Sequence, residues 1–160
     1  MIEHIRFTVN RRAVALEIDG TTPLLAVLRD QLGLKAARFG CGLEQCGCCV
    51  VLVDGEPVYS CARPVASLTG SEVTTLEACR DGDRLDRLRD AFLAEQAGQC
   101  GYCLSGVLMS AFALLERNPD PTRADVIAAL DRHLCRCGAH NRIIRAVRRA
   151  AAMRRSETVS

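Results

Sequence analysis

Four cysteines in the first half of the chain constrain its fold more than any other feature. Cys41, Cys46, Cys49 and Cys61 follow the pattern C-x4-C-x2-C, with the fourth cysteine more distant. This is the plant-type spacing for a [2Fe–2S] cluster, in which each iron takes two thiolates. A compact loop can bring three of these cysteines to one side of a cluster, while the fourth returns from the far strand of a hairpin. The spacing therefore predicts an iron–sulfur centre on a loop.

Glycines lie between these cysteines, at Gly40, Gly42 and Gly47. They permit positive φ and let the backbone approach the inorganic sulfides, so that amide N–H groups can point at sulfur. One alternative is a zinc knuckle, although zinc sites usually show two pairs of closely spaced cysteines. The other is a disulfide framework, which is typical of small secreted chains.

Ten cysteines are many for a chain of 160 residues, and whether they form disulfides depends on the cellular compartment. The sequence enters an alternating stretch at once, without a charged-then-apolar leader. We therefore expect a cytoplasmic protein whose cysteines are reduced or bound to metal. A net charge of +2 argues against a general nucleic-acid binder. No apolar run approaches the ~20 residues of a membrane span, so direct membrane insertion is not expected.

The first half has the pattern of an α+β domain over residues 1–78. Alternation and turn signals predict strands at 2–10, 13–18, 50–53, 58–60 and 73–76. Asp54 and Gly55 between two of these strands are a strong hairpin signal. Apolar residues at helical spacing predict a helix over 24–32, with Pro23 at its start and Gly33 at its end. Two hairpins with a helix packed across them would form the domain.

Helical periodicity begins after a predicted linker at 80–83 and favours a four-helix bundle over residues 79–160. The expected helices are 85–96, 102–117, 122–130 and 142–155. Thr122 and Asp125 resemble a capping box at the start of the third helix, with Asp in place of the usual Glu or Gln.

A second set of four cysteines falls at the ends of these helices: Cys100, Cys103, Cys135 and Cys137. A C-x2-C pair at a helix start can offer two thiolates to one metal. A C-x-C pair cannot place both side chains on one helical face, so it must lie in a loop. Two helix N-termini, with their partial positive charge, would converge on the set. Spacing alone leaves a cluster, a four-cysteine zinc site and a redox dithiol open.

The two sets together carry a family resemblance. The run CGLEQCGCC, then QCGYC, then LCRC resembles the iron–sulfur subunit of the molybdenum hydroxylases, the xanthine dehydrogenase and aldehyde oxidase family. The resemblance covers nearly the whole chain and implies two [2Fe–2S] clusters. An outer cluster would lie in a plant-ferredoxin-like β-grasp domain, and an inner cluster in the helical bundle. By position, the resemblance assigns the outer cluster to Cys41, Cys46, Cys49 and Cys61, and the inner cluster to Cys100, Cys103, Cys135 and Cys137.

The resemblance also implies a partner and a function. A large subunit would hold a molybdopterin-type molybdenum cofactor, and Gln99 and Cys137 match positions that face the pterin in relatives. Substrate would be hydroxylated there with oxygen from water. Electrons would leave one at a time through the inner and then the outer cluster to an external acceptor. This chain would be the electron-transfer subunit.

Two short segments resemble the isoquinoline or nicotinate oxidising type within this family: Leu104-Ser105 and Gly138-Ala139-His140. Members of that group often pass electrons to a cytochrome and lack a flavin subunit, so the acceptor is expected to be a cytochrome or a flavin. The implied substrate is an N-heteroaromatic compound or an aldehyde.

The chain itself shows no catalytic base, nucleophile or phosphate loop, so no catalytic residue is expected on it. Two other functions stay open at this point. One is a free-standing soluble ferredoxin, for which the second domain would be unnecessary. The other is a zinc-stabilised interaction module.

Cys48 and Cys79 belong to neither ligand set. Cys48 stands where relatives commonly have alanine, and Cys79 follows a strand-like segment. We interpret both as non-ligands, and Cys79 as a small buried apolar group. His140 follows the inner set, where a capping or packing role is favoured over ligation.

Overall fold

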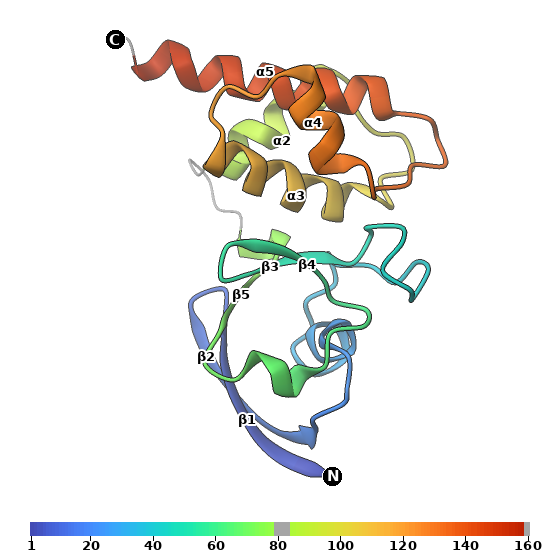
Figure 1. Cartoon of the computed structure of the whole chain (residues 1–160), viewed down its shortest axis with the longest axis vertical. Helices are drawn as coiled ribbons and strands as arrows, with labels where there is room; N and C mark the ends of the chain where they lie inside the picture. Colours follow the sequence, from blue (N-terminus) through green and yellow to red (C-terminus); the bar gives the residue numbers. More distant parts are fainter. Residues whose placement is uncertain (79–83, 159–160) are drawn as a thin grey trace.

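The computed structural model describes residues 1–78 and 84–158, and Cys79 and the predicted linker at 80–83 lie outside this range. The chain forms two stacked parts (Figure 1). Residues 1–78, here called the sheet lobe, contain every described strand, and residues 84–158, the helical lobe, contain the longer helices. The architecture is therefore an α+β ferredoxin-like part followed by a helical part.

Five strands form one sheet in the order β2-β1-β5-β3-β4. Their bounds are β1 Ile2–Val9, β2 Arg12–Asp19, β3 Val50–Val53, β4 Glu56–Tyr59 and β5 Glu72–Thr74. β1 and β5 are parallel, whereas the other pairs are antiparallel. The turn between β1 and β2 places Asn10 and Arg11 at positive φ, 51° and 66°. Positive φ at both central residues matches the twist of a two-residue hairpin.

The helix expected over 24–32 is a short α-helix, α1 Leu24–Ala26, followed by a π-helix, η1 Val27–Gln31. Leu24, Val27 and Leu28 are fully buried and pack with the sheet residues of the same lobe. Two 3-10 segments complete the lobe, η2 Val65–Leu68 and η3 Leu76–Ala78.

The strand predicted at 73–76 is too long, because β5 ends at Thr74. Beyond Thr74, hydrogen bonds to the side chain of Asn10 replace those of the strand ladder. Its Oδ1 accepts from the Thr75 amide at 2.8 Å, and its Nδ2 donates to the Thr75 hydroxyl at 2.9 Å. The chain then turns into η3, where Leu76 packs against the helical lobe.

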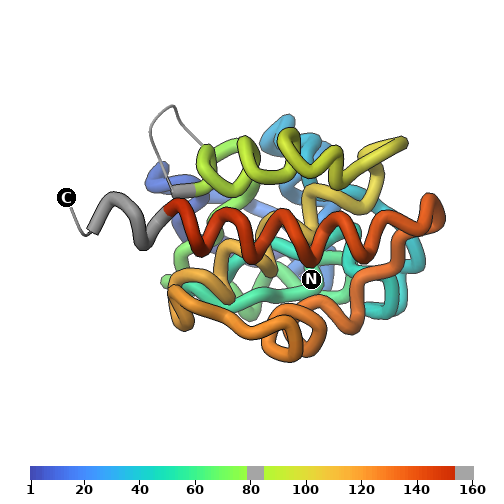
Figure 2. Tube along the Cα trace, turned by 90° about the horizontal axis from the view of Figure 1, so that it is seen from above, coloured from blue at the N-terminus to red at the C-terminus, as the bar shows by residue number. Residues whose placement is uncertain are grey.

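Four helices make up the helical lobe: α2 Arg84–Ala94, α3 Leu104–Arg117, α4 Arg123–Leu130 and α5 His140–Thr158. The capping box predicted at α4 is confirmed, since Thr122 and Asp125 exchange both hydrogen bonds. α5 is the longest helix and crosses the top of the molecule (Figure 2), where it packs against α2 and α4. Arg145 and Arg149 of α5 both pair with Glu95 after α2. None of the described helices is long and apolar enough to cross a membrane.

β3 joins the two lobes because both of its faces are buried. Val51 packs into the core of the sheet lobe, whereas Val50 and Leu52 pack into the core of the helical lobe. Alternate residues of a strand point to opposite faces, so one short strand serves two cores. α3 lies over β3 and β4 and covers this side of the sheet.

The helix α3 approaches the cysteine loop very closely at Gly106. A Cβ added at this residue would lie 1.8 Å from the carbonyl oxygen of Gly47. Only glycine allows this contact without moving backbone. The Ser105 hydroxyl, next to it, donates to the carbonyl of Cys48 at 3.3 Å. The start of α3 is thereby fixed against the loop that carries the first cysteine set.

We expect Gly106→Ala to destabilise the protein by about 1–3 kcal/mol, the usual effect of overpacking. For a chain of this size that lowers the melting temperature by about 2–4 °C per kcal/mol. Circular dichroism on the cluster-loaded protein measures the shift. Arg117→Ala on the same helix is the control, because it removes only an exposed ion pair with Glu56. Equal melting temperatures for the two variants would contradict the packing argument.

Candidate iron–sulfur sites

The loop before β3 carries the first cysteine set, and the segment after β4 returns its fourth member. The Cys41 and Cys46 side chains lie within hydrogen-bonding reach of each other, and so do those of Cys49 and Cys61. The hairpin formed by β3 and β4 therefore does what the spacing predicted. It brings a cysteine from outside the loop to face a cysteine at the loop's end.

Backbone amides of the loop point at sulfur. The amides of Leu43 and Gln45 donate to the Cys41 sulfur at 3.3 and 3.2 Å, and the Cys41 amide donates to the Cys46 sulfur at 3.3 Å. The amides of Leu43 and Gln45 lower the pKa of Cys41 to about 7. Donors of this kind stabilise negative charge on a thiolate or a bound cluster.

The positive φ predicted for the loop glycines is confirmed at two of the three. A Cβ at Gly40 would lie 2.6 Å from the Cys46 sulfur, and Gly42 and Gly47 have φ of +68° and +77°. A side chain at Gly40 would therefore occupy the space beside a sulfur, and left-handed backbone at the other two favours glycine.

The second set lies at the starts of α3 and α5. Here the side chains of Cys100 and Cys137 are within hydrogen-bonding reach, and Cys103 and Cys135 form a second such pair. Burial raises the pKa of the Cys103 thiol to about 12. Burial also acts to raise the pKa of Cys135, but nearby amides, including that of Ala139 at 3.5 Å, lower it overall.

The cysteines lie in pairs, and this arrangement distinguishes a site for a [2Fe–2S] cluster from a site for a single zinc ion. A [2Fe–2S] cluster takes two thiolates at each iron, so four cysteines should lie as two pairs. A structural zinc ion instead needs four ligands around one point. In this structure each set offers its four thiols as two such pairs. The donor set fits two [2Fe–2S] clusters, and none of the nine described cysteines forms a disulfide.

Hydrogen bonds connect the two cysteine sets directly. The amide of Leu134, the residue before Cys135, donates to the carbonyl of Cys46 at 3.0 Å. Side chains add further bonds across the same junction: Arg38 to the Gly101 carbonyl at 2.8 Å, Tyr102 to the Phe39 carbonyl at 2.6 Å, and Arg132 to the Glu44 carbonyl at 2.7 Å. The two sets are thus parts of one interface.

His133 fills the centre of that junction. It is 5% exposed, and its Nε2 lies 2.8 Å from the Ser110 hydroxyl of α3. Its ring occupies the space that a Cβ of Gly47 would need, since that atom would lie 2.2 Å from Nδ1. Burial lowers the pKa of His133 to about 4, so the imidazole is neutral near neutral pH. No sequence pattern indicated this contact.

Gln99 and His140 both contact the segment around the second set. The Gln99 side chain donates to the carbonyl of Cys137 at 3.4 Å, and both residues are at least partly exposed. His140 begins α5, and its Nε2 lies 3.3 Å from the carbonyl of His133. The packing role favoured for His140 agrees with this contact.

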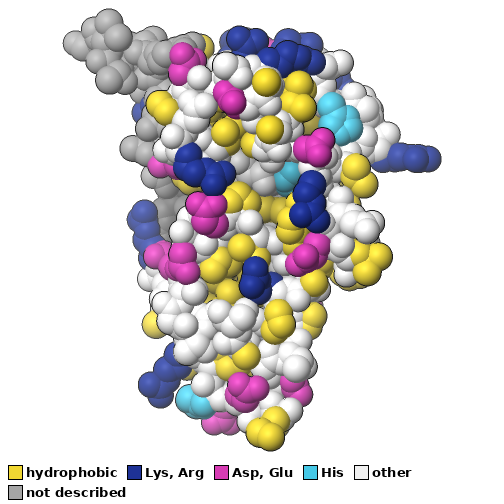
Figure 3. All heavy atoms as spheres, in the orientation of Figure 1, with side chains coloured by type: hydrophobic (Ala, Val, Ile, Leu, Met, Phe, Trp, Pro, Cys, Tyr) yellow, Lys and Arg dark blue, Asp and Glu magenta, His cyan; other side chains and the backbone are white. Residues whose placement is uncertain are grey.

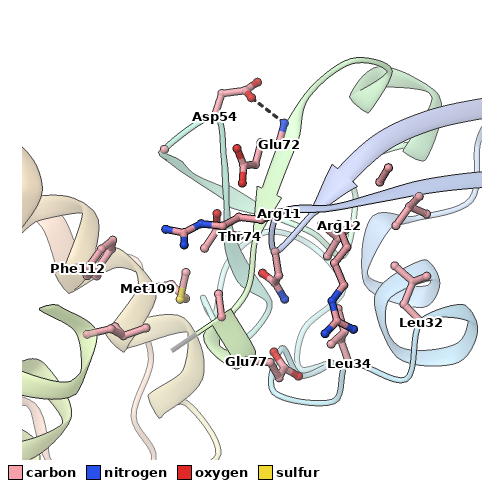
Figure 4. A pocket seen from close by; sticks show the side chains of 17 residues that line it. Arg11, Arg12, Leu32, Leu34, Asp54, Glu72, Thr74, Glu77, Met109 and Phe112 are labelled. Atoms are coloured by element: carbon pink, nitrogen blue, oxygen red, sulfur yellow. Dashed lines mark hydrogen bonds between the residues drawn. The ribbon is translucent and has the colours of Figure 1, made fainter. Parts of the chain in front are cut away.

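A cavity of about 1130 Å³ lies elsewhere, between the β1–β2 turn and α3. Figure 4 shows Arg11 of the turn, Arg12 of β2, Glu72 of β5 and Met109 of α3 among its lining side chains. None of the eight cysteines of the two sets is among its described lining residues, so it is separate from both sets. On the face seen in Figure 3, acidic and basic side chains are interspersed over both lobes.

Comparisons with known proteins agree with this geometry. The family of 2Fe-2S iron-sulfur cluster binding domains matches residues 7–80, and the family of [2Fe-2S] binding domains matches residues 75–148. A nicotinate dehydrogenase subunit of Pseudomonas putida is 44% identical over 151 residues, 94% of this chain and 96% of that protein. The chain is an iron–sulfur small subunit of the molybdenum hydroxylase family. It is accordingly part of an oxidoreductase complex and carries two [2Fe–2S] clusters.

Other relatives of this iron–sulfur subunit support the same assignment. The alpha subunit of isoquinoline 1-oxidoreductase from Brevundimonas diminuta is 43% identical over 92% of this chain and 97% of that protein. The crystal structure of quinoline 2-oxidoreductase from Pseudomonas putida 86 matches 96% of the chain with a TM-score of 0.88 and 33% identity. The aldehyde oxidoreductase of Desulfovibrio desulfuricans matches 98% with a TM-score of 0.90 and 36% identity. In that protein the match covers 18% of a much longer chain.

We expect Cys48→Ala to leave the iron content of the protein unchanged, because two clusters need eight thiolates and the two predicted ligand sets supply eight without Cys48. Iron and acid-labile sulfide analysis of the purified protein measures this. Cys49→Ala, one residue away, is the matched control and should lose iron. Loss of a cluster's worth of iron in the Cys48 variant would show that the pairing assigns the wrong ligands.

Proposed function

We propose that this chain relays electrons from a molybdenum centre on a partner subunit, through its inner cluster and then its outer cluster, to an external acceptor. The observation that carries the proposal is the junction between the two cysteine sets. Cys46 of one set and the residue before Cys135 of the other share a backbone hydrogen bond of 3.0 Å. Two redox centres held in one rigid interface suit one-electron transfer between them.

The ligand assignment is part of this proposal. Cys41, Cys46, Cys49 and Cys61 hold the outer cluster, and Cys100, Cys103, Cys135 and Cys137 hold the inner one. The clusters, when bound, supply one-electron redox chemistry. The chain's own residues position the sulfurs, direct amides at them and exclude water from the inner pair around Cys103, which is 7% exposed.

The partner would lie against the exposed part of the inner set. Cys100 and Gln99 are exposed, and the Gln99 side chain donates a hydrogen bond to the carbonyl of Cys137. Gln99 and Cys137 would face the pterin of a molybdopterin-type cofactor there. At the outer set, exposed Phe39 and Leu43 flank the cysteine loop and offer apolar contact to an electron acceptor.

The finer parts of the proposal draw on the relatives. The relatives include a nicotinate dehydrogenase, an isoquinoline 1-oxidoreductase and a quinoline 2-oxidoreductase, which support an N-heteroaromatic substrate for the whole complex. An aldehyde is the alternative, since an aldehyde oxidoreductase is also among them. The acceptor would be a cytochrome or a flavin. Residues 1–78 would form a β-grasp domain and 79–160 a four-helix bundle. A cytoplasmic location would keep the cysteines reduced and available to the clusters.

Ligand substitutions should separate the two clusters. Cys46→Ser should remove the outer cluster's signal in low-temperature electron paramagnetic resonance and largely spare the inner one. Substrate should then still reduce molybdenum and the inner cluster in a single turnover, whereas turnover with the external acceptor is lost. Cys103→Ser should have the opposite effect on the signals. A folded variant of either kind that lost both signals would contradict the assignment of separate ligand sets.

Expression with the neighbouring genes tests the partnership. The chain should copurify with a large subunit that contains molybdenum and pterin, both measurable by elemental and cofactor analysis. Gln99→Ala should weaken this complex or slow inner-cluster reduction by substrate, while Gln45→Ala, an exposed glutamine of the outer loop, should not. A native complex free of molybdenum and pterin would instead favour a free-standing ferredoxin.

A further inference from the structure

Cys48 is the one cysteine of the described residues that the two ligand sets do not use. It is 6% exposed and lies in a buried cluster with Cys46 of the outer set and Cys103 of the inner set. The cluster therefore places the Cys48 side chain beside one ligand from each set. Its position therefore bears on the electronic properties of those ligands.

The thiol of Cys48 points toward the same space as that of Cys46. A Cβ placed on Gly40 would lie 2.6 Å from the Cys46 sulfur and 3.5 Å from the Cys48 sulfur. The Cys46 side chain is within hydrogen-bonding reach of Cys48. Both sulfurs thus lie on the same side of the loop, next to Gly40, which has no side chain.

The backbone of Cys48 is held in this orientation from both lobes. Its carbonyl accepts from the Arg38 amide at 3.1 Å within the loop, and from the Ser105 hydroxyl at 3.3 Å across the junction. Gly47, directly before it, has φ of +77° and is packed against the start of α3. The backbone of Cys48 is therefore fixed by both lobes, and its side chain is buried.

We propose that the Cys48 thiol donates a hydrogen bond to the Cys46 thiolate and thereby raises the reduction potential of the outer cluster relative to the inner one. The inference rests on the proposed function, because it takes Cys46 as a ligand of the outer cluster. A hydrogen bond to a ligand sulfur stabilises the more negative, reduced form of a cluster. The thiol is a weak donor, so the effect is a moderate bias.

The bias favours electron flow in the direction that the function requires. An outer cluster with a raised potential accepts an electron from the inner cluster more readily. Alanine at this position would fill part of the same space but has no donor. Cys48 would then be a positioning residue that changes the reduction potential of the outer cluster indirectly, through its hydrogen bond to Cys46.

The test is a redox titration of the complete complex, followed by low-temperature electron paramagnetic resonance of both clusters. Cys48→Ala should lower the outer cluster's potential. The equilibrium constant for electron sharing between the clusters should fall by about three- to tenfold, and a tenfold change corresponds to 59 mV for one electron. Cys48→Ser keeps a donor and should retain the wild-type potential or exceed it.

Ser60→Ala is the matched control. Ser60 is fully buried beside Cys61, but its hydroxyl donates to the carbonyl of Cys49 at 2.6 Å and not to a sulfur. Loss of the Ser60 hydroxyl should leave the reduction potential of the outer cluster unchanged. An unchanged potential in Cys48→Ala, equal shifts in the alanine and serine variants, or an equal shift in Ser60→Ala would each overturn the inference. These outcomes leave the proposed function intact, whereas a wild-type complex that lacked one cluster signal would contradict the function itself.

Discussion

The contact on which the rest of the structure depends is the approach of α3 to the loop that carries the first cysteine set. Gly106 lies so close to the carbonyl of Gly47 that a Cβ would be 1.8 Å from it. The Leu134 amide bonds to the Cys46 carbonyl on the same interface. Because these contacts involve backbone on both sides, the two lobes cannot rotate against each other without breaking them. The relative position of the clusters therefore follows from a packing constraint between helix and loop.

Burial and amide donors act on the cysteines in opposite directions. Burial raises the pKa of the Cys49 and Cys103 thiols, whereas amides lower that of Cys41. In a bound cluster the same two influences set how easily negative charge accumulates on sulfur. The loop around Cys41 supplies donors at the surface, and the start of α3 supplies a dry site. One chain can in this way hold two clusters of the same type in different surroundings.

Much of this was predictable because the signals are local. Cysteine spacing, the Asp54-Gly55 turn and the Thr122 capping box each depend on residues a few positions apart, and each is present in the structure. The error at Leu76 arose because the side chain of Asn10, 65 residues before Thr75, ends the strand. His133 and Arg132 could not be assigned from sequence for the same reason. Their partners, Ser110, Gly47 and Glu44, lie far away along the chain.

The central claim is that every chain holds two [2Fe–2S] clusters in the paired cysteines. Iron and acid-labile sulfide analysis of the purified wild-type protein, combined with counting of paramagnetic spins after full reduction, tests it most directly. The account predicts iron and sulfide in equal amounts, with two distinct signals of equal spin count on each chain. Zinc in place of iron, or iron and sulfide sufficient for a single cluster with one signal, would contradict it.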